Sequence, residues 1–375
     1  MRRYDIDSLR VIAFALLILY HVGMFFVPWG FHLKNNVIYP EIRFPMLFLN
    51  QWRLPLLFVI SGMGTWFALG KRSGGQFAGE RLKRLLVPFL FGCLFIVPPQ
   101  IYFERLAQGA FSGSYFFDFW PANFTTGAYP EGNISWHHLW FILYLLIFSL
   151  LLIPAFFYLK KHPECRMIRW TQALTKKRFG LYAFVIPLFI LQATLSDRFP
   201  STNALVGDWF NLANYCTLFF FGFLLLTTGD GFWNNVTRNR WMYLGFGAVC
   251  FPLLILGRMT PGDFFLKGEL LFLVGALNMW SWILAIFGFA ATCLNRPSKA
   301  ISYANEAVYP FYILHQTVLI VLAYYLMDID MAFWPKFSIM VVGTFGGCWL
   351  IYEFCIRRWS VMRLLFGMKR RDNCK

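Results

Sequence analysis

A chain of 375 residues in which 58% of the side chains are hydrophobic and 14% are charged is unlike a soluble protein, where about a quarter of the residues are charged. The mean hydropathy of +0.55 indicates several membrane-spanning segments. A net charge of +16 would suggest nucleic-acid binding in a soluble protein. Here no Arg-rich run interleaved with stacking aromatics lies outside the apolar segments, so we expect no nucleic-acid partner.

Apolar segments near the length that a bilayer requires recur along the whole chain. The predicted spans are 8–28, 54–70, 85–101, 139–159, 179–195, 209–228, 241–257, 269–293, 303–327 and 332–356. They predict an all-α polytopic membrane protein with about ten transmembrane helices: a single transmembrane domain over 1–356 and a basic tail over 357–375. With the N-terminus inside, most of the 34 Lys and Arg residues fall in inner loops and in the tail. The positive-inside rule therefore predicts that both termini are cytoplasmic.

The first span carries two ionisable residues, Arg10 and His21, with ten residues between them. A helix turns about 100° per residue, so eleven steps return to nearly the same face about 16 Å further along the axis. Ionisable groups at membrane depth usually face a cavity or a partner. Simpler interpretations are that Arg10 pairs with Asp7 at the inner interface and that His21 forms an interhelical hydrogen bond.

The next two spans add further Arg residues. We expect Arg53 at the outer end of the second span, and close helix contact at Gly62 and Gly64. Before the third span, Arg81 and Arg84 lie three residues apart and share a helix face. The pair is either a positive-inside anchor or an anion-binding site.

The longest outer loop, 102–138, is rich in aromatic residues and contains Glu131. This composition suits either binding of a sugar or contact with the lipid surface. At its end, His137 and His138 are adjacent, so their side chains project to different sides of a helix, and no third ligand stands at a metal-site spacing. We therefore expect no bound metal. In the ninth span, His315 is more typical of an interhelical hydrogen bonder than of a catalyst.

The charged and polar residues named above, taken in chain order, resemble the motifs of integral-membrane acyltransferase family three. They most closely resemble those of its glucan-succinylating branch. The matching motifs are Arg10-x10-His21, Arg53 with Phe58–Gly62, Arg81-x-x-Arg84, His138–Phe141 and Tyr312–Gln316. The resemblance covers nearly the whole chain. It implies a non-aminoacyl acyltransferase of the bacterial inner membrane, in contact with membrane lipids. Its donor would be cytoplasmic acetyl-CoA or succinyl-CoA, a co-substrate rather than a bound cofactor, and its acceptor a hydroxyl of an envelope glycan on the outer side.

The resemblance also implies roles for individual residues. His21 acts as general base, or alternatively becomes acylated itself. Arg81 and Arg84, with help from Arg10, attract the phosphates of acyl-CoA, and Arg53 stabilises an oxyanion or an anionic acyl group. The residues expected to support His21 or to contact the acceptor are His138, His315 and Glu131. A transporter of anionic or glycan solutes is the competing hypothesis, although no internal repeat is evident. A partner protein without catalytic activity is a third.

Overall fold

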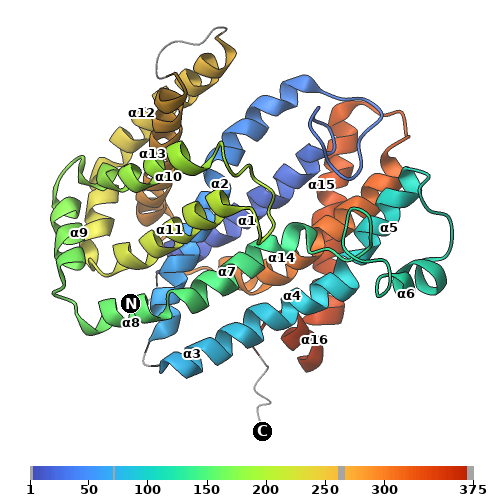
Figure 1. Cartoon of the computed structure of the whole chain (residues 1–375), viewed down its shortest axis with the longest axis horizontal. Helices are drawn as coiled ribbons and strands as arrows, with labels where there is room; N and C mark the ends of the chain where they lie inside the picture. Colours follow the sequence, from blue (N-terminus) through green and yellow to red (C-terminus); the bar gives the residue numbers. More distant parts are fainter. Residues whose placement is uncertain (1–2, 71, 261–266, 370–375) are drawn as a thin grey trace. The chain divides into compact units, whose positions relative to one another are not determined.

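The computed structural model describes residues 3–70, 72–260 and 267–369 (Figure 1). Most of these residues are helical, and none of them belongs to a strand. Eight helical segments are long and apolar enough to cross a membrane. A ninth is formed if the bent pair His137–Leu151 and Ile153–Lys161 counts as one span, and Gly180–Leu195 is a shorter apolar helix. Each of the ten predicted spans falls on one of these segments, which confirms the all-α polytopic class.

The chain divides into two compact units. Unit 1 consists of Met1–Ala13, Phe48–Ala78 and Ile147–Ile301, and unit 2 of Phe14–Leu47, Gly79–Leu146 and Ser302–Lys375. The helices wholly or mainly in unit 1 are α2 (Arg43–Leu69), α8 (Ile153–Lys161), α9 (Arg166–Lys176), α10 (Val185–Leu195), α11 (Trp209–Leu226), α12 (Asp230–Met259) and α13 (Lys267–Cys293). Those of unit 2 are α4 (Val87–Phe91), α5 (Pro98–Ala107), α6 (Trp120–Ala122), α14 (Lys299–Leu326), α15 (Phe333–Leu350) and α16 (Ser360–Leu365). The chain passes from one unit to the other within α1 (Tyr4–Met24), α3 (Gly74–Arg81) and α7 (Trp140–Leu151), and also in the first turns of α2 and α14.

Glycines bring the helices of unit 1 into direct backbone contact. A Cβ atom on Gly62 of α2 would lie 1.9 Å from the carbonyl oxygen of Phe219 in α11, and one on Gly222 would lie 2.0 Å from that of Val59. The predicted close helix contact at Gly62 is thereby confirmed. In the same unit, α12 and α13 run side by side as an antiparallel pair (Figure 1).

In unit 2, the third predicted span is part of one long helical segment, Gly74–Ala107, with two π-helical turns. The turns are η2 (Leu82–Leu86) and η3 (Gly92–Ile96), and each ends two residues before a proline, Pro88 or Pro98. A proline lacks the N–H for an intrahelical bond and its ring crowds the preceding turn. A π-helical turn takes up one extra residue at these points without ending the helix.

The predicted start of the second span and the predicted start of the outer loop are wrong. Each correction places a charged residue inside a helix. Helix α2 begins at Arg43, after the short 3₁₀ turn η1 (Pro40–Ile42), so Arg53 lies inside the helix and not at its end. Helix α5 continues to Ala107, so Glu104 projects from a helix and not from the outer loop. The remaining short segments are η4 (Tyr115–Phe119), η5 (His137–Leu139), η6 (Gly180–Phe184) and η7 (Ile351–Ile356).

A hydrophobic cluster in unit 2 fixes the end of α1 against α14 and α15. Its buried members are Val22, Phe25, Phe26, Leu33, Leu319, Ile320, Ala323 and Met340. The C-terminal helix α16 also belongs to this unit, where buried Arg363 donates a hydrogen bond of 2.9 Å to Glu306. Residues 370–375 of the predicted basic tail lie outside the described residues. The cluster places the segments that carry His21 and His315 next to each other.

Candidate active site

His21 stands near the end of α1 and is half-buried. Its Nδ1 atom lies 3.0 Å from the carbonyl oxygen of Leu17, one turn earlier, and 3.2 Å from Nε2 of His315 in α14. The two imidazole rings have their centroids 5.0 Å apart. The histidine of the first span therefore has a direct partner in another helix.

The contacts of His315 define which nitrogen of each ring carries a proton. Nδ1 of the buried His315 lies 2.7 Å from the carbonyl oxygen of Tyr312 and must donate to it. In the neutral ring, Nε2 of His315 is then an acceptor, and the hydrogen bond requires Nδ1–H on His21. This tautomer leaves the lone pair of His21 on Nε2, where a general base needs it.

His138 joins the same group of residues from η5, the 3₁₀ turn just before α7. It is buried, its Nε2 donates to the carbonyl of Ile313 at 3.0 Å, and its ring centroid lies 5.1 Å from that of His315. The hydroxyl of Tyr312 donates to the carbonyl of His138. The structure thus brings together His21, His138 and His315, the three histidines that the resemblance singles out.

Two buried glutamines extend the hydrogen-bonded network. Nε2 of Gln316 lies 3.1 Å from Oε1 of Gln100 and 3.1 Å from Nε2 of His32, so it donates to both. Gln100 in turn donates to Thr317 at 2.8 Å and lies 3.5 Å from Nδ1 of His138. The sequence signal for these residues is the presence of amide side chains inside apolar spans, where polar groups seek partners.

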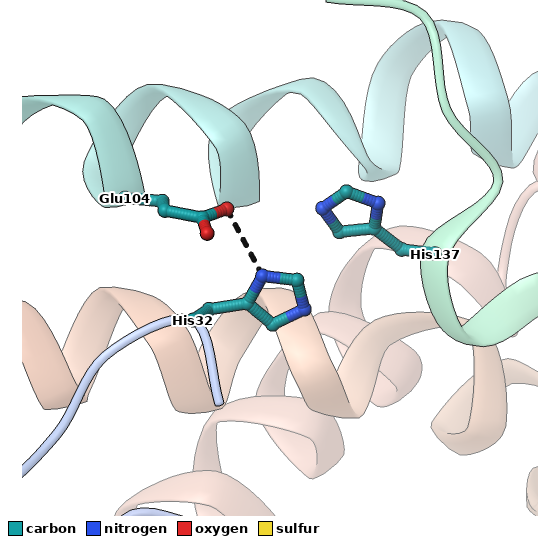
Figure 2. Close-up of side chains that lie close together, drawn as sticks. All are labelled: His32, Glu104 and His137. Carbon is teal, nitrogen blue, oxygen red and sulfur yellow. Dashed lines mark hydrogen bonds and ion pairs between the residues drawn. The ribbon is translucent and has the colours of Figure 1, made fainter. Parts of the chain in front are cut away.

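The network leads to His32, Glu104 and His137 (Figure 2). Nδ1 of His32 lies 3.0 Å from Oε2 of Glu104, and the rings of His32 and His137 stack with centroids 4.5 Å apart. The hydroxyl of Tyr129 donates to Oε1 of Glu104 at 3.1 Å. Partial burial, together with the charge and hydrogen bond of Glu104, raises the pKa of Tyr129 to about 12, so the phenol keeps its proton for this bond.

The predicted Arg residues occupy separate surroundings. In unit 1, Arg10 forms an ion pair of 3.3 Å with Asp7, as the simpler interpretation expected. Arg53 is buried in the same unit, and its charge acts on Tyr215. In unit 2, the charges of Arg81 and Arg84 both act on the half-buried Tyr309.

Arg84 has two further contacts that fix its guanidinium group. It lies 3.5 Å from the carboxylate of Glu80 and donates to the carbonyl of Gly367 at 3.3 Å. Glu131, in contrast, is exposed, and only its main-chain carbonyl contacts Arg105 in the hydrogen bonds described. The carboxylate that joins the histidines is therefore Glu104, which sequence reasoning assigned to the outer loop together with Glu131 but did not choose as a site residue.

A family model described as an acyltransferase domain matches residues 3–353. Glucans biosynthesis protein C of Escherichia coli (strain SMS-3-5 / SECEC) is 21% identical over 395 residues, covering 100% of this chain and 97% of that protein. The protein of that name from Shigella dysenteriae serotype 1 (strain Sd197) aligns with the same identity and coverage. No solved structure matches the chain.

Proposed function

The chain belongs to the acyltransferase family whose model spans residues 3–353, and from this premise we propose that it is a membrane-bound O-acyltransferase acting on an envelope glycan. The donor in this proposal is acetyl-CoA or succinyl-CoA on the cytoplasmic side, and the acceptor is a carbohydrate hydroxyl on the outer side of the bacterial inner membrane. A glycan acceptor is supported by relatives named for glucan biosynthesis that align over the whole chain.

The observation that carries the proposal is the hydrogen bond between His21 and His315. It favours the tautomer of His21 with a basic Nε2, and it gives the imidazolium that forms on protonation a partner for its Nδ1–H. In the reaction, Nε2 of His21 removes the proton of the acceptor hydroxyl as its oxygen attacks the thioester carbonyl carbon. The carbon–sulfur bond then breaks, and the CoA thiolate takes the proton from His21.

Further residues take the roles that their charges suit. In unit 2, Arg81 and Arg84 attract the phosphates of acyl-CoA. The roles that the resemblance implies for Arg10 and Arg53, which belong to unit 1, stay predictions. His138 supports His21 indirectly, through His315. This role is supported by the ring of His138, which lies next to that of His315. Attack of His21 itself on the thioester, giving an acyl-imidazole, is the alternative chemistry.

The test uses the full-length protein in detergent with radiolabelled acetyl-CoA or succinyl-CoA and an envelope-glycan fraction. We expect label transfer and release of free CoA by the wild type, and loss of both in a folded His21→Gln variant. The matched control is His162→Ala, since His162 is an exposed histidine of unit 1. Label that stays on the protein without acceptor identifies the covalent route. Solute uptake into liposomes, with no transfer by the wild type, would instead support the transporter.

A further inference from the structure

His32, Glu104 and His137 bring three ligand atoms together from distant parts of unit 2. His32 comes from the loop after α1, Glu104 from α5 and His137 from η5 at the start of the next span (Figure 2). We propose that these three side chains bind a divalent metal ion of the Zn²⁺ class. This proposal goes beyond acyl transfer and replaces the expectation, drawn from spacing alone, that no metal is bound.

The geometry is close to that of a three-ligand site. One ligand atom from each of the three residues lies within 4.8 Å of the other two, and Nδ1 of His32 is 3.0 Å from Oε2 of Glu104. Around a tetrahedral Zn²⁺ with bonds of roughly 2.0–2.2 Å, ligand atoms stand about 3.3 Å apart. The rings of His32 and His137 stack at an interplanar angle of 13°. Binding therefore requires one ring to rotate so that both lone pairs meet at the ion.

His137 supplies the most specific observation. Its Nδ1 is held by Oγ of Ser135 at 2.6 Å, whereas its Nε2 is buried and has no hydrogen-bond partner in the described part of the chain. Figure 2 shows this ring directed toward Glu104 and His32. Leaving a buried polar atom without a hydrogen-bond partner is unfavourable, because the atom loses its bonds to water and gains none in return. A metal ion would give this nitrogen the partner that the protein side chains do not.

The backbone at His137 is also unusual. Its φ angle is +38°, in the left-handed region that residues with a Cβ seldom occupy. Such conformations are retained where the surrounding structure requires them, commonly at ligand sites. Here the left-handed turn separates the directions of two adjacent histidines, so that His137 faces Glu104 while His138 bonds Ile313.

Neighbouring residues provide the outer contacts that metal ligands usually have. The hydroxyl of Tyr129 donates a hydrogen bond to the second carboxylate oxygen of Glu104. Gln316 lies 3.1 Å from Nε2 of His32. With a metal on Nδ1, that Nε2 carries a hydrogen, so metal binding requires the Gln316 amide to flip its oxygen toward the ring and to give up its hydrogen bond to Gln100. Arg105 fixes the intervening loop by donating to the carbonyl of Gly132 at 2.7 Å.

The ligand set indicates the kind of ion. Two imidazoles and one carboxylate suit Zn²⁺ and neighbouring first-row divalent ions, and they lack the thiolates typical of closed structural zinc sites. Three protein ligands leave one position of a tetrahedron for water or a hydroxyl group. The site is therefore of the open type.

The test measures Zn²⁺ binding to the full-length protein, purified without a His tag, treated with a chelator and desalted. Calorimetric titration should give one equivalent of Zn²⁺ per chain. Both Glu104→Gln, which keeps the side-chain shape, and His137→Ala should weaken binding at least tenfold. Tyr129→Phe should weaken it by roughly 10–100-fold, as expected for an outer contact of a ligand. The control His162→Ala should bind as the wild type does.

Folding is checked separately by size-exclusion profile and by melting in chelator. A Zn²⁺-induced rise in Tm of the wild type, absent in Glu104→Gln, supports the site. Equal affinity in the wild type and Glu104→Gln, or no stoichiometric binding at all, overturns it. The readouts do not involve acyl transfer, so failure of the metal site is distinguishable from failure of the proposed enzyme activity.

Discussion

The Nε2 atom of His315 lies 3.2 Å from Nδ1 of His21, although 294 residues separate them in the chain. The other nitrogen of His315 is committed to the carbonyl of Tyr312, so its lone pair points at His21. A proton that arrives on Nε2 of His21 leaves Nδ1–H donating to this lone pair. In the proposed mechanism, His315 therefore orients His21 as a carboxylate orients the histidine of a Ser-His-Asp triad.

We predict that His315→Gln lowers kcat by an amount on the order of ten- to a thousandfold, less than the loss in His21→Gln. The Michaelis constant for acyl-CoA should change little, because His315 is a positioning residue in this scheme and binds no substrate. The limb of the kcat–pH profile that reports the protonation of His21 should also move along the pH axis. An unchanged kcat and pH profile in a folded His315→Gln variant would contradict the role.

The helices and the first pair of candidate residues are predictable from sequence because they depend on local pattern. Spans of apolar residues locate the membrane helices, and the spacing of Arg10 and His21 places both on α1. The contact at Gly62 is predictable for a related reason: a small residue in an apolar span favours close approach of another helix.

The cluster of His32, Glu104 and His137 is formed by tertiary structure, so no local sequence pattern predicts it. His32 lies in an irregular loop, 72 residues from its partner Glu104. His137 is 105 positions beyond His32, far outside any metal-ligand spacing that can be read from a sequence. The pairing of His21 with His315 is hidden in the same way. An intramembrane histidine shows that a partner is needed but does not identify it.

The glycine contact between α2 and α11 predicts a clear effect on stability. Gly62→Ala places a Cβ atom 1.9 Å from the carbonyl of Phe219, so the helices must separate. We expect a loss of about 1–3 kcal/mol in the free energy of unfolding, as for other overpacked sites. Thermal unfolding in detergent measures this loss. Gly75→Ala is the control, because its Cβ meets nothing within 4 Å, and it should leave Tm unchanged or slightly raised. Equal Tm values for the two variants would argue against the close contact.

The proposed donor site predicts an effect of Arg84 on binding of acyl-CoA. Arg84→Gln keeps a donor for the carbonyl of Gly367 but removes the charge. The Michaelis constant for acyl-CoA should rise roughly tenfold, because a charge-assisted hydrogen bond to phosphate is lost. Added salt should raise this constant for the wild type more than for the variant. Exposed Arg198 in unit 1 provides the control, Arg198→Gln. Identical salt dependence in all three proteins would exclude Arg84 from the donor site.

Lys34, in the loop between α1 and α2, gives a prediction about pH. Its ammonium group donates to the carbonyls of Met24 at 2.6 Å and Trp29 at 3.1 Å, and also to that of Val27. Burial lowers the pKa of Lys34 from 10.5 to about 8. Between these values the unfolded chain binds more protons than the folded protein, so this residue's contribution to stability rises with pH. That contribution is fully present above pH 10.5 and is lost as the pH falls through 8.

The measurement is Tm from pH 7 to 11 in detergent for the wild type, Lys34→Met and Lys34→Arg. Neither variant titrates at this position in that range, since the guanidinium group stays protonated. The difference in Tm between the wild type and each variant should increase as the pH rises from 8 to 10.5. A difference that is constant, or that decreases with pH, would mean that folding does not depress the pKa of Lys34. A difference that increases with pH would show that folding lowers the pKa of Lys34, because burial in the loop that also carries His32 disfavours the charged ammonium group.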